Sequence, residues 1–391
     1  MPKVSVVIPT LNRANLLRWA LKSAVEQDFQ DFEIIVSDDC SIDDTRRVVD
    51  SFGSPKVIYV APPKRLNMPD SFEFALKQAR GEYLTFLTDD SYLMPDCISV
   101  ALRNMDRFGV DLAVWRHCSY FGADWIEPSR RNVLYLPQLT FRSDLRDSRQ
   151  SLRRWFTSIR AHSAEMPRSI NSLCHRSIIE KALAVQGRFF QAPAPDHSSG
   201  AAMLLNTERY VLIDQALVID GVSPASIGPS QSFNFGESAQ EFYRSFKMEM
   251  DEVTFLGIPT TPAIIAKSFE NTRRYYPGCP ELNMKNVLEN IVDSLVKLEV
   301  YGSDMSSYWQ TLKTFANTSP NRLSSVVLKQ RIDSWVKWRL VKAVRLTPAF
   351  AWIEGLRGLK TIKGAREGFE NIELAAMYLA EWDRSRRSTI T

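Results

Sequence analysis

The chain has 391 residues, of which 45% are hydrophobic and 24% charged, and its formal net charge is +4. These proportions are ordinary for a globular protein, so they exclude a disordered or low-complexity chain. The small net charge does not favour nucleic-acid binding by the chain as a whole. At this length we expect a catalytic α/β unit followed by a second, helical region.

The five cysteines are odd in number, widely spread and never arranged as Cys-x-x-Cys. They therefore suggest neither a disulfide framework nor a zinc site. The start Met1-Pro2-Lys3 leads directly toward an apolar strand without the features of a secretory signal, and no apolar run approaches the ~20 residues that span a bilayer. We expect a cytoplasmic protein that meets a membrane only from its surface.

The first 115 residues alternate between strand and helix patterns. Apolar, β-branched runs predict strands at 4–10, 32–36, 56–60, 82–87 and 109–115. Helical spacing of apolar residues predicts intervening helices, the first beginning at Asn12 or Asn15 and ending near 27, the others at 44–52, 71–80 and 97–108. This alternation predicts an α/β fold with a doubly wound, mostly parallel sheet flanked by helices.

The pattern weakens between about 119 and 188, where we expect irregular insertions. A helix at 198–205, a strand at 210–213 and the run 217–221 then close the sheet, and we assign Asp214, Asp220 and 221–226 to a closing turn without a catalytic role. Helical patterns recur at 287–300, 323–346 and 369–382. The predicted domains are thus an α/β catalytic domain at 1–235 and a mainly helical C-terminal region at 236–391.

Two acidic clusters follow apolar strands. Asp38-Asp39 ends the run that begins at Ile34, and Asp89-Asp90 ends the run that begins at Tyr83. Ligands of open α/β sheets bind where parallel strands end at their carboxyl edge. Carboxylates at this edge can therefore meet a ligand, and their oxygens suit a hard divalent cation, for which Asp90 is our candidate ligand.

The strand 4–10 with Leu11-Asn12-Arg13, the Asp38-Asp39-Cys40-Ser41 cluster, and Gly81-Glu82-Tyr83 leading to Leu87-Thr88-Asp89-Asp90 resemble the family 2 glycosyltransferases of the GT-A fold. The resemblance is close over roughly residues 3 to 120 and looser to about 228. It implies a nucleotide-sugar donor, with UDP favoured, Mg²⁺ or Mn²⁺ as cofactor, and transfer with inversion at the anomeric carbon.

The resemblance also implies roles for single residues. Asp90 corresponds to the final aspartate of the family's Asp-x-Asp motif, and Thr88 stands where the first one is expected. Asp38 and Asp39 would bind the base and ribose, in a pocket lined by residues from the end of the first strand and the loops beside it: Pro9, Thr10, Arg13, Asn67 and Asp89. The alternative for Asp38, Asp43 and Asn67 is that they only cap turns and helices.

Inverting transfer needs a general base for the acceptor hydroxyl. Asp196 is our candidate because Pro193 and Pro195 fix its loop and because it lies in the part of the sequence where the family carries its acidic base. The alternative is an ordinary N-cap for the helix at 198–205, and both roles can hold together. His197 either helps to bind metal or substrate or is structural, and His117, His162 and His175 show no ligand spacing.

Residues 329–363 contain nine basic residues against two acidic ones, interleaved with Trp335, Trp338 and Trp352. Such a segment suits contact with anionic lipid headgroups, which would bring the enzyme to a lipid-linked acceptor. The alternative is a solvated helix face whose tryptophans pack on the catalytic domain. Nucleic-acid binding is a weaker third option, since no known module is visible.

The sequence therefore predicts a hexosyltransferase-like enzyme of polysaccharide biosynthesis. It would move a sugar from a nucleotide diphosphate sugar to a hydroxyl of a glycan or lipid-linked glycan, at the cytoplasmic face of the inner membrane. One alternative is a catalytically degenerate sugar-nucleotide- or glycan-binding protein, motivated by Thr88. A nucleotidyltransferase is less favoured, because no Gly-rich phosphate loop follows the first strand.

Overall fold

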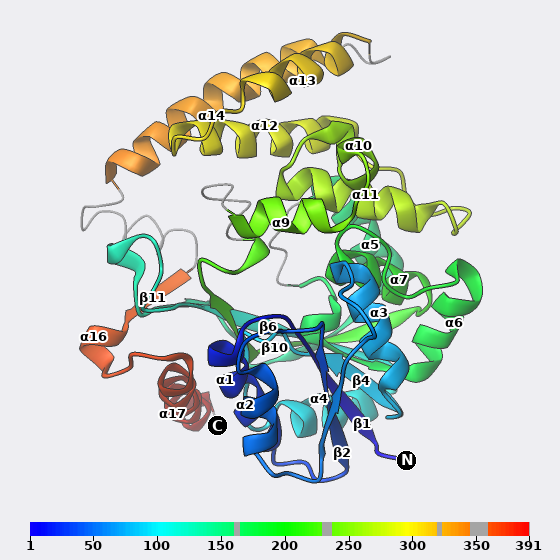
Figure 1. Cartoon of the computed structure of the whole chain (residues 1–391), viewed down its shortest axis with the longest axis vertical. Helices are drawn as coiled ribbons and strands as arrows, with labels where there is room; N and C mark the ends of the chain where they lie inside the picture. The colour runs from blue at the N-terminus through cyan, green and yellow to red at the C-terminus, as the bar shows by residue number, and fades with distance from the viewer. Residues whose placement is uncertain (160–164, 229–236, 319–322, 345–358, 391) are drawn as a thin grey trace.

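The computed structural model describes residues 1–159, 165–228, 237–318, 323–344 and 359–390 (Figure 1). Its strands are β1 (Val4–Thr10), β2 (Phe32–Asp38), β3 (Val57–Val60), β4 (Tyr83–Phe86), β5 (Tyr92–Leu93), β6 (Leu112–Phe121), β7 (Val133–Pro137), β8 (Ser143–Asp147), β9 (Ser172–His175), β10 (Arg209–Val222) and β11 (Leu359–Lys363).

The helices flank the sheet and continue into a C-terminal layer. They are α1 (Ala14–Val25), α2 (Thr45–Ser51), α3 (Met68–Gln78), α4 (Cys97–Phe108), α5 (Ser148–Ser158), α6 (Arg176–Gln186), α7 (Pro195–Leu205), α9 (Glu237–Ser245), α10 (Met250–Val253), α11 (Thr261–Arg273), α12 (Met284–Val300), α13 (Ser306–Thr318), α14 (Ser324–Val344), α16 (Gly364–Glu367) and α17 (Ile372–Ile390). No helix in the described ranges has both the length and the apolar character needed to cross a membrane.

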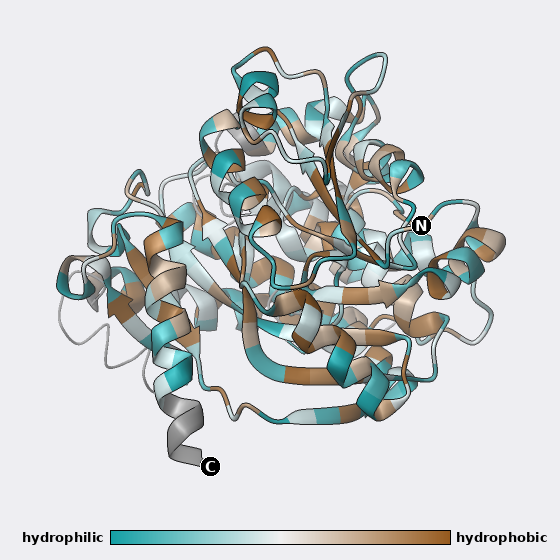
Figure 2. Ribbon diagram, turned by 90° about the horizontal axis from the view of Figure 1, so that it is seen from below, coloured by the Kyte–Doolittle hydropathy of each residue, from teal (hydrophilic) through white to brown (hydrophobic). Residues whose placement is uncertain are grey.

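The strand order is β11-β7-β6-β9-β4-β1-β2-β3, with β10 beside β5, β6 and β8. The pairs β4-β1, β1-β2, β2-β3 and β6-β10 are parallel, and antiparallel strands extend this centre. The predicted α/β fold with a helical C-terminal region is confirmed. In Figure 2 the hydrophobic residues concentrate in the strands of the sheet, whereas the helices carry both hydrophobic and hydrophilic residues.

Successive side chains of the central strands point to opposite faces of the sheet, so each face has its own hydrophobic core. Val6 and Ile8 pack on one face with residues of α1 and α4, and Val7 packs on the other with residues of α3, α7 and α11. Strands that are buried on both faces read as unbroken apolar runs, which is why their positions could be predicted.

The prediction of irregular insertions at 119–188 is wrong, because β7, β8, α5, β9 and α6 lie there. The two expected segments 210–213 and 217–221 are one strand, β10. The register of β10 against β6 shifts between Ile213 and Ala216, and this irregularity accommodates the polar pair Asp214-Gln215 within the strand. Asp214 accepts hydrogen bonds from Arg116 and Thr140 there.

The C-terminal segments return to the sheet. β11 pairs with β7, and α17 contacts α1, β5 and β10. Figure 1 shows β11, α16 and α17 on the left of the molecule. The expected boundary between residues 235 and 236 lies outside the described residues, so the domain division stays a prediction.

The basic tryptophan-bearing segment begins in α14, which packs along α12. Trp338 donates from its indole nitrogen to Asp293 of α12 at 3.1 Å, whereas Trp335 is 51% exposed. Trp338 therefore packs on α12, within the C-terminal region, and not on the catalytic domain as the alternative expected. Trp352 lies outside the described residues.

Candidate active site

The two acidic clusters lie at the same edge of the sheet. β1 runs between β2 and β4, Thr10 is in register with Asp38, and the Leu87 amide donates to the Val7 carbonyl at 2.8 Å. The carboxyl ends of β1, β2 and β4 therefore meet at one edge, which is where open α/β sheets bind their ligands. The structure brings Asp38, Asp39, Asp89 and Asp90 to that edge.

Asp89 connects the ends of β1 and β4. It is 4% exposed and accepts hydrogen bonds from Thr10 Oγ1 at 2.9 Å and from Arg13 Nη1 at 3.0 Å. Burial raises the pKa of Asp89, and the positive charge of Arg13 opposes this rise. Arg13 also donates to the carbonyl of Ala225, so Asp89 and Arg13 together connect β1, β4 and the segment after β10.

Asp90 lies at the carboxyl edge of the sheet, beside the end of β10. Its Oδ2 accepts from Ser226 Oγ at 2.7 Å and is 3.7 Å from Arg13 Nη1. A Cβ added to Gly221 would lie 1.8 Å from the Asp90 carbonyl oxygen, so only glycine lets β10 pass this close. Thr88, at the expected place of the first motif aspartate, shares a hydrogen bond of 2.6 Å with Ser91 Oγ.

Asp38 is held by two donors. The Tyr59 hydroxyl donates to its Oδ2 at 2.7 Å, and the Ser41 amide donates to its Oδ1 at 3.0 Å. Burial and this carboxylate together raise the pKa of Tyr59 to about 12, so Tyr59 remains a donor at neutral pH. Asp38 thus fixes the turn that leaves β2, as expected for a turn-capping residue.

Asp39 is anchored to both β1 and the loop before α3. Its amide donates to the Thr10 carbonyl at 2.9 Å, and its Oδ1 accepts from the Leu66 amide at 2.9 Å. Burial raises its pKa. Asn67, next to Leu66, caps α3 through a 3.0 Å bond from the Asp70 amide, so the helix-capping alternative describes its side chain.

Asp196 lies inside the first turn of α7. The N-cap of this helix is Ala194, and Pro195 precedes Asp196, so the N-cap alternative for Asp196 is wrong. Its Oδ2 is 3.8 Å from Arg168 Nη1 and 3.7 Å from His197 Nε2. The carboxylate is therefore free of a capping bond and lies against a buried cation.

His197 is buried with its ring beside Trp155 and Phe269, at centroid distances of 5.6 Å and 6.4 Å. Burial lowers its pKa, so the imidazole is neutral near pH 7. These contacts favour the structural alternative for His197, with Nε2 directed to Asp196.

Asp220, His117 and Arg168 complete this cluster. Sequence reasoning gave Asp220 no catalytic role, found no ligand spacing for His117 and did not single out Arg168. Asp220 Oδ2 lies 3.5 Å from His117 Nε2, and the charges of Arg168, Asp90 and Asp196 all act on it. Burial raises the pKa of Asp220 to about 7, and burial lowers the pKa of His117 to about 3. One signal was available, because Asp220 ends an apolar run in the same way as Asp38 and Asp90 do.

The donor set fits a divalent cation only if the substrate contributes to it. Among the described residues no three His, Cys, Asp or Glu side chains are grouped to hold a metal ion. Mg²⁺ is commonly held by one or two carboxylates together with substrate phosphates and water. Asp90 can supply such a carboxylate, because its Oδ2 accepts one hydrogen bond, from the neutral Ser226 hydroxyl, and the Arg13 guanidinium lies 3.7 Å away.

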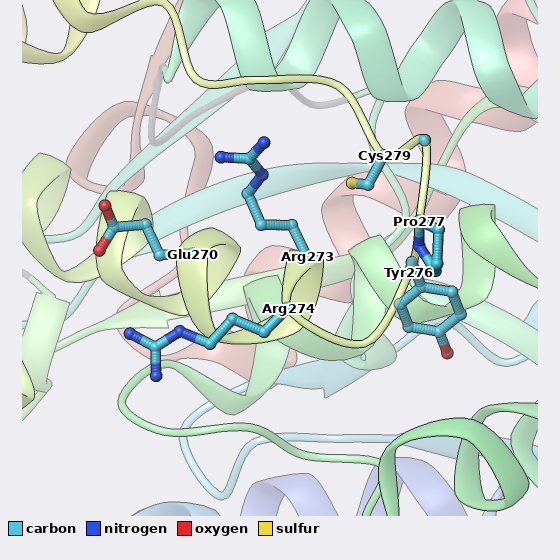
Figure 3. Close-up of a pocket in the computed structure, with 7 residues that line it drawn as sticks. Glu270, Arg273, Arg274, Tyr276, Pro277 and Cys279 are labelled. Carbon is cyan, nitrogen blue, oxygen red and sulfur yellow. The ribbon is translucent and has the colours of Figure 1, made fainter.

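The pocket in Figure 3 is not this site. It has a volume of about 410 Å³ and is lined by Glu270, Arg273 and Arg274 of α11 and its end, and by residues 276–279 of the following loop. A larger adjoining pocket of about 900 Å³ reaches Asp111 before β6 and Arg209 at the start of β10. The larger pocket therefore lies at the amino ends of these strands, opposite the carboxylate edge, and it shares residues 276–279 with the smaller one.

Residues 5–172 match the family model described as Glycosyl transferase family 2. A segment of 106 residues is 42% identical to the GalNAc(5)-diNAcBac-PP-undecaprenol beta-1,3-glucosyltransferase of Campylobacter jejuni, covering 26% of this chain and 34% of that protein. A segment of 122 residues is 32% identical to the poly(ribitol-phosphate) beta-N-acetylglucosaminyltransferase TarS of Staphylococcus aureus, covering 29% of this chain and 20% of TarS. The chain thus matches about a third or less of the length of these relatives.

Solved structures resemble the chain over more of its length. The S. aureus TarS fragment 1-349 in complex with UDP-GlcNAc superposes with a TM-score of 0.54 at 17% identity, covering 87% of this chain and 91% of the fragment. The same fragment in complex with UDP gives a TM-score of 0.51 at 18% identity. At such identities the likeness shows a common fold.

Proposed function

Because the chain carries a family 2 glycosyltransferase domain with the GT-A fold, we propose that it transfers a sugar from a nucleotide diphosphate sugar to a hydroxyl of a glycan or lipid-linked glycan. The observation that carries this proposal is the connection of two carboxylate clusters at one sheet edge. Thr10 bonds to Asp39 through its carbonyl and to Asp89 through its hydroxyl, so the two clusters hold a fixed mutual position.

The donor would lie across this edge. Asp38 and Asp39 would receive the base and ribose, with Pro9, Thr10, Arg13, Asn67 and Asp89 lining or supporting the pocket. UDP is the favoured nucleotide, supported by the UDP and UDP-GlcNAc complexes of the similarly folded TarS fragment. The diphosphate would then reach Asp90.

Asp90 would hold Mg²⁺ or Mn²⁺ together with the diphosphate oxygens. A bound divalent cation neutralises negative charge that develops on a departing diphosphate. Ser226 and Arg13 orient the Asp90 carboxylate, and Arg13 adds a positive charge on the same side.

Asp196 would act as general base. The acceptor hydroxyl oxygen attacks the anomeric carbon, the bond from that carbon to the diphosphate oxygen breaks, and the hydroxyl proton passes to Asp196. Attack opposite the leaving group inverts the anomeric carbon. Arg168 orients the Asp196 carboxylate at 3.8 Å, and Asp220 lies in the same cluster.

A lipid-linked acceptor is supported by the name of the C. jejuni relative, which includes undecaprenol. Such an acceptor would place this protein at the cytoplasmic face of the inner membrane, held peripherally through residues in 329–363. The name of TarS gives poly(ribitol-phosphate) as what its N-acetylglucosaminyl transfer acts on, which supports a hydroxyl-bearing polymer as the broader class of acceptor.

The test is release of nucleotide diphosphate from a panel of UDP-, GDP- and dTDP-sugars with Mn²⁺, with and without glycan acceptors. Asp90→Ala should lose both Mn²⁺-dependent UDP binding and turnover, whereas Asp196→Asn should keep UDP binding and lose transfer. Asp144→Ala is the matched control, since this aspartate lies on β8 with a 61% exposed side chain. Full turnover in Asp90→Ala would refute the metal assignment, and UDP binding by the wild type without any turnover would favour the degenerate binding protein.

A further inference from the structure

The orientation of α14 is fixed by one carboxylate of α12. Asp293 accepts hydrogen bonds from Ser334 Oγ at 2.8 Å, from Lys337 Nζ at 2.9 Å and from Trp338 Nε1 at 3.1 Å. Ser334 is 1% exposed and Val327 is 6% exposed. These contacts determine which face of α14 is covered and which face is directed outward.

The outward face of α14 is apolar. Leu328, Ile332, Trp335, Val336 and Leu340 are between 47% and 63% exposed. Their spacing of i, i+4, i+7, i+8 and i+12 places them along one side of the helix. We call these five residues the α14 stripe. A contiguous exposed stripe of large apolar side chains marks an interaction surface more often than scattered single residues do.

Basic residues surround the α14 stripe. α14 carries five basic residues and only one acidic residue, Asp333. Lys329 and Arg339 are exposed on the same side as the stripe, and the Arg339 guanidinium lies 5.0 Å from the centre of the Trp335 ring. Lys337, by contrast, is engaged by Asp293.

We propose that the α14 stripe lies on the surface of an anionic phospholipid bilayer, with the aliphatic side chains in the acyl boundary and Lys329, Arg339 and the Trp335 indole at the headgroups. This inference rests on the proposed transfer to a lipid-linked acceptor and names the surface that holds the enzyme there. Apolar faces with a basic rim and tryptophan suit this position in a bilayer.

The charge around the α14 stripe favours an anionic bilayer over a second copy of the chain as its partner. Two copies joined through the α14 stripe would bring the basic rims of both helices together, and like charges at an interface oppose association. An anionic bilayer instead offers apolar volume and negative charge together. Trp338 takes no part in the contact, because its indole nitrogen is bonded to Asp293.

The experiment is co-sedimentation of the full chain, without donor, with vesicles of phosphatidylglycerol and phosphatidylethanolamine or of phosphatidylcholine alone. We expect binding to the anionic vesicles only, weakening as salt is added. The triple variant Leu328→Ser, Ile332→Ser, Leu340→Ser should bind at least roughly tenfold more weakly, because each buried CH₂ contributes ~0.8 kcal/mol. Lys329→Gln with Arg339→Gln should weaken binding roughly 30-fold, at ~1 kcal/mol per basic residue.

Val185→Ser with Met377→Ser is the matched control, because these residues are 47% and 56% exposed on α6 and α17. It should bind vesicles as the wild type does, and circular dichroism and UDP binding should be unchanged in every variant. Undiminished binding by the triple variant would overturn the inference, as would equal binding of the wild type to phosphatidylcholine. A dimer in sedimentation velocity that the triple variant dissociates would also overturn it.

The outcome is separable from that of the proposed function. Vesicle binding without any sugar transfer would leave this inference standing and refute the transfer reaction. Sugar transfer to a soluble acceptor without vesicle binding would confirm the transfer reaction and overturn the inference about the α14 stripe.

Discussion

Gly221→Ala tests whether the position of Asp90 depends on the close passage of β10. The new Cβ would lie 1.8 Å from the Asp90 carbonyl oxygen and 2.8 Å from the carbonyl carbon, and ordinary contacts begin at 3.4 Å. The neighbouring atoms are backbone, so no side-chain rotation relieves the clash. Going from 1.8 Å to 3.4 Å requires β10 and the Asp90 turn to separate by about 1.6 Å.

This separation should affect turnover more than folding. A misplacement of about 1 Å at a reacting centre lowers the rate about 10²-fold, so we expect kcat to fall by about 10²-fold or more. Overpacking should lower the free energy of unfolding by about 1–3 kcal/mol. The assay is the initial rate of nucleotide diphosphate release at saturating donor and Mn²⁺, with the unfolding transition measured on the same samples.

Gly228→Ala is the matched control, because its Cβ would meet nothing within 4 Å and Gly228 follows Gly221 closely in sequence. It should leave both kcat and the unfolding transition unchanged. If Gly221→Ala also keeps wild-type turnover, the reasoning that Asp90 must occupy this position is refuted.

Three further predictions concern residues at the carboxylate edge and in the cluster around Asp220. Arg13→Ala should lower the free energy of unfolding by about 3 kcal/mol in urea titrations, because it leaves the Asp89 carboxylate buried without its cation, and a loss under about 1 kcal/mol would contradict this. Asp220→Asn should remove a pH dependence of stability measured in EDTA. The folded pKa of Asp220, about 7, lies above the ordinary 3.8, so the stability that this carboxyl contributes is fully present below about pH 4. That contribution falls by at most about 1.4 kcal/mol per pH unit as the pH rises to about 7. The same pH slope in the variant would assign it to another group. Asn67→Ala should lower stability by about 1 kcal/mol through the lost α3 cap, and Asn67→Asp should restore it; unchanged UDP affinity in both would exclude contact of Asn67 with the nucleotide.

The centre of the fold could be predicted because its signals are local. β1, β2 and β4 are apolar runs buried on both faces, and the expected helix 97–108 coincides with α4. Since parallel strands share a carboxyl edge, the positions of Asp38, Asp39 and Asp90 followed from the strand order.

The remaining parts depend on contacts between distant segments. β11 pairs with β7 across more than 200 residues, and no local pattern indicates that partner. The polar pair Asp214-Gln215 interrupts the apolar run of β10, and only the bonds from Arg116 and Thr140 explain how Asp214 stays within the strand.

The cluster around Asp220 was missed for the same reason. His117 comes from β6, Arg168 from the segment before β9, and Asp220 from the end of β10. Asp196 is different, because a local signal was available and was not used. Proline favours the first helical position, so Pro195 could have placed Asp196 inside the helix, whereas the helix was expected only at 198–205.

The most direct test of the account is a crystal structure with UDP and Mn²⁺, using the anomalous signal to locate the metal. The account predicts Mn²⁺ between the Asp90 carboxylate and the UDP diphosphate, with the uracil and ribose beside Asp38 and Asp39. Mn²⁺ and UDP bound elsewhere, for example in the pocket beside Arg273, with the carboxylate edge left unchanged, would contradict it.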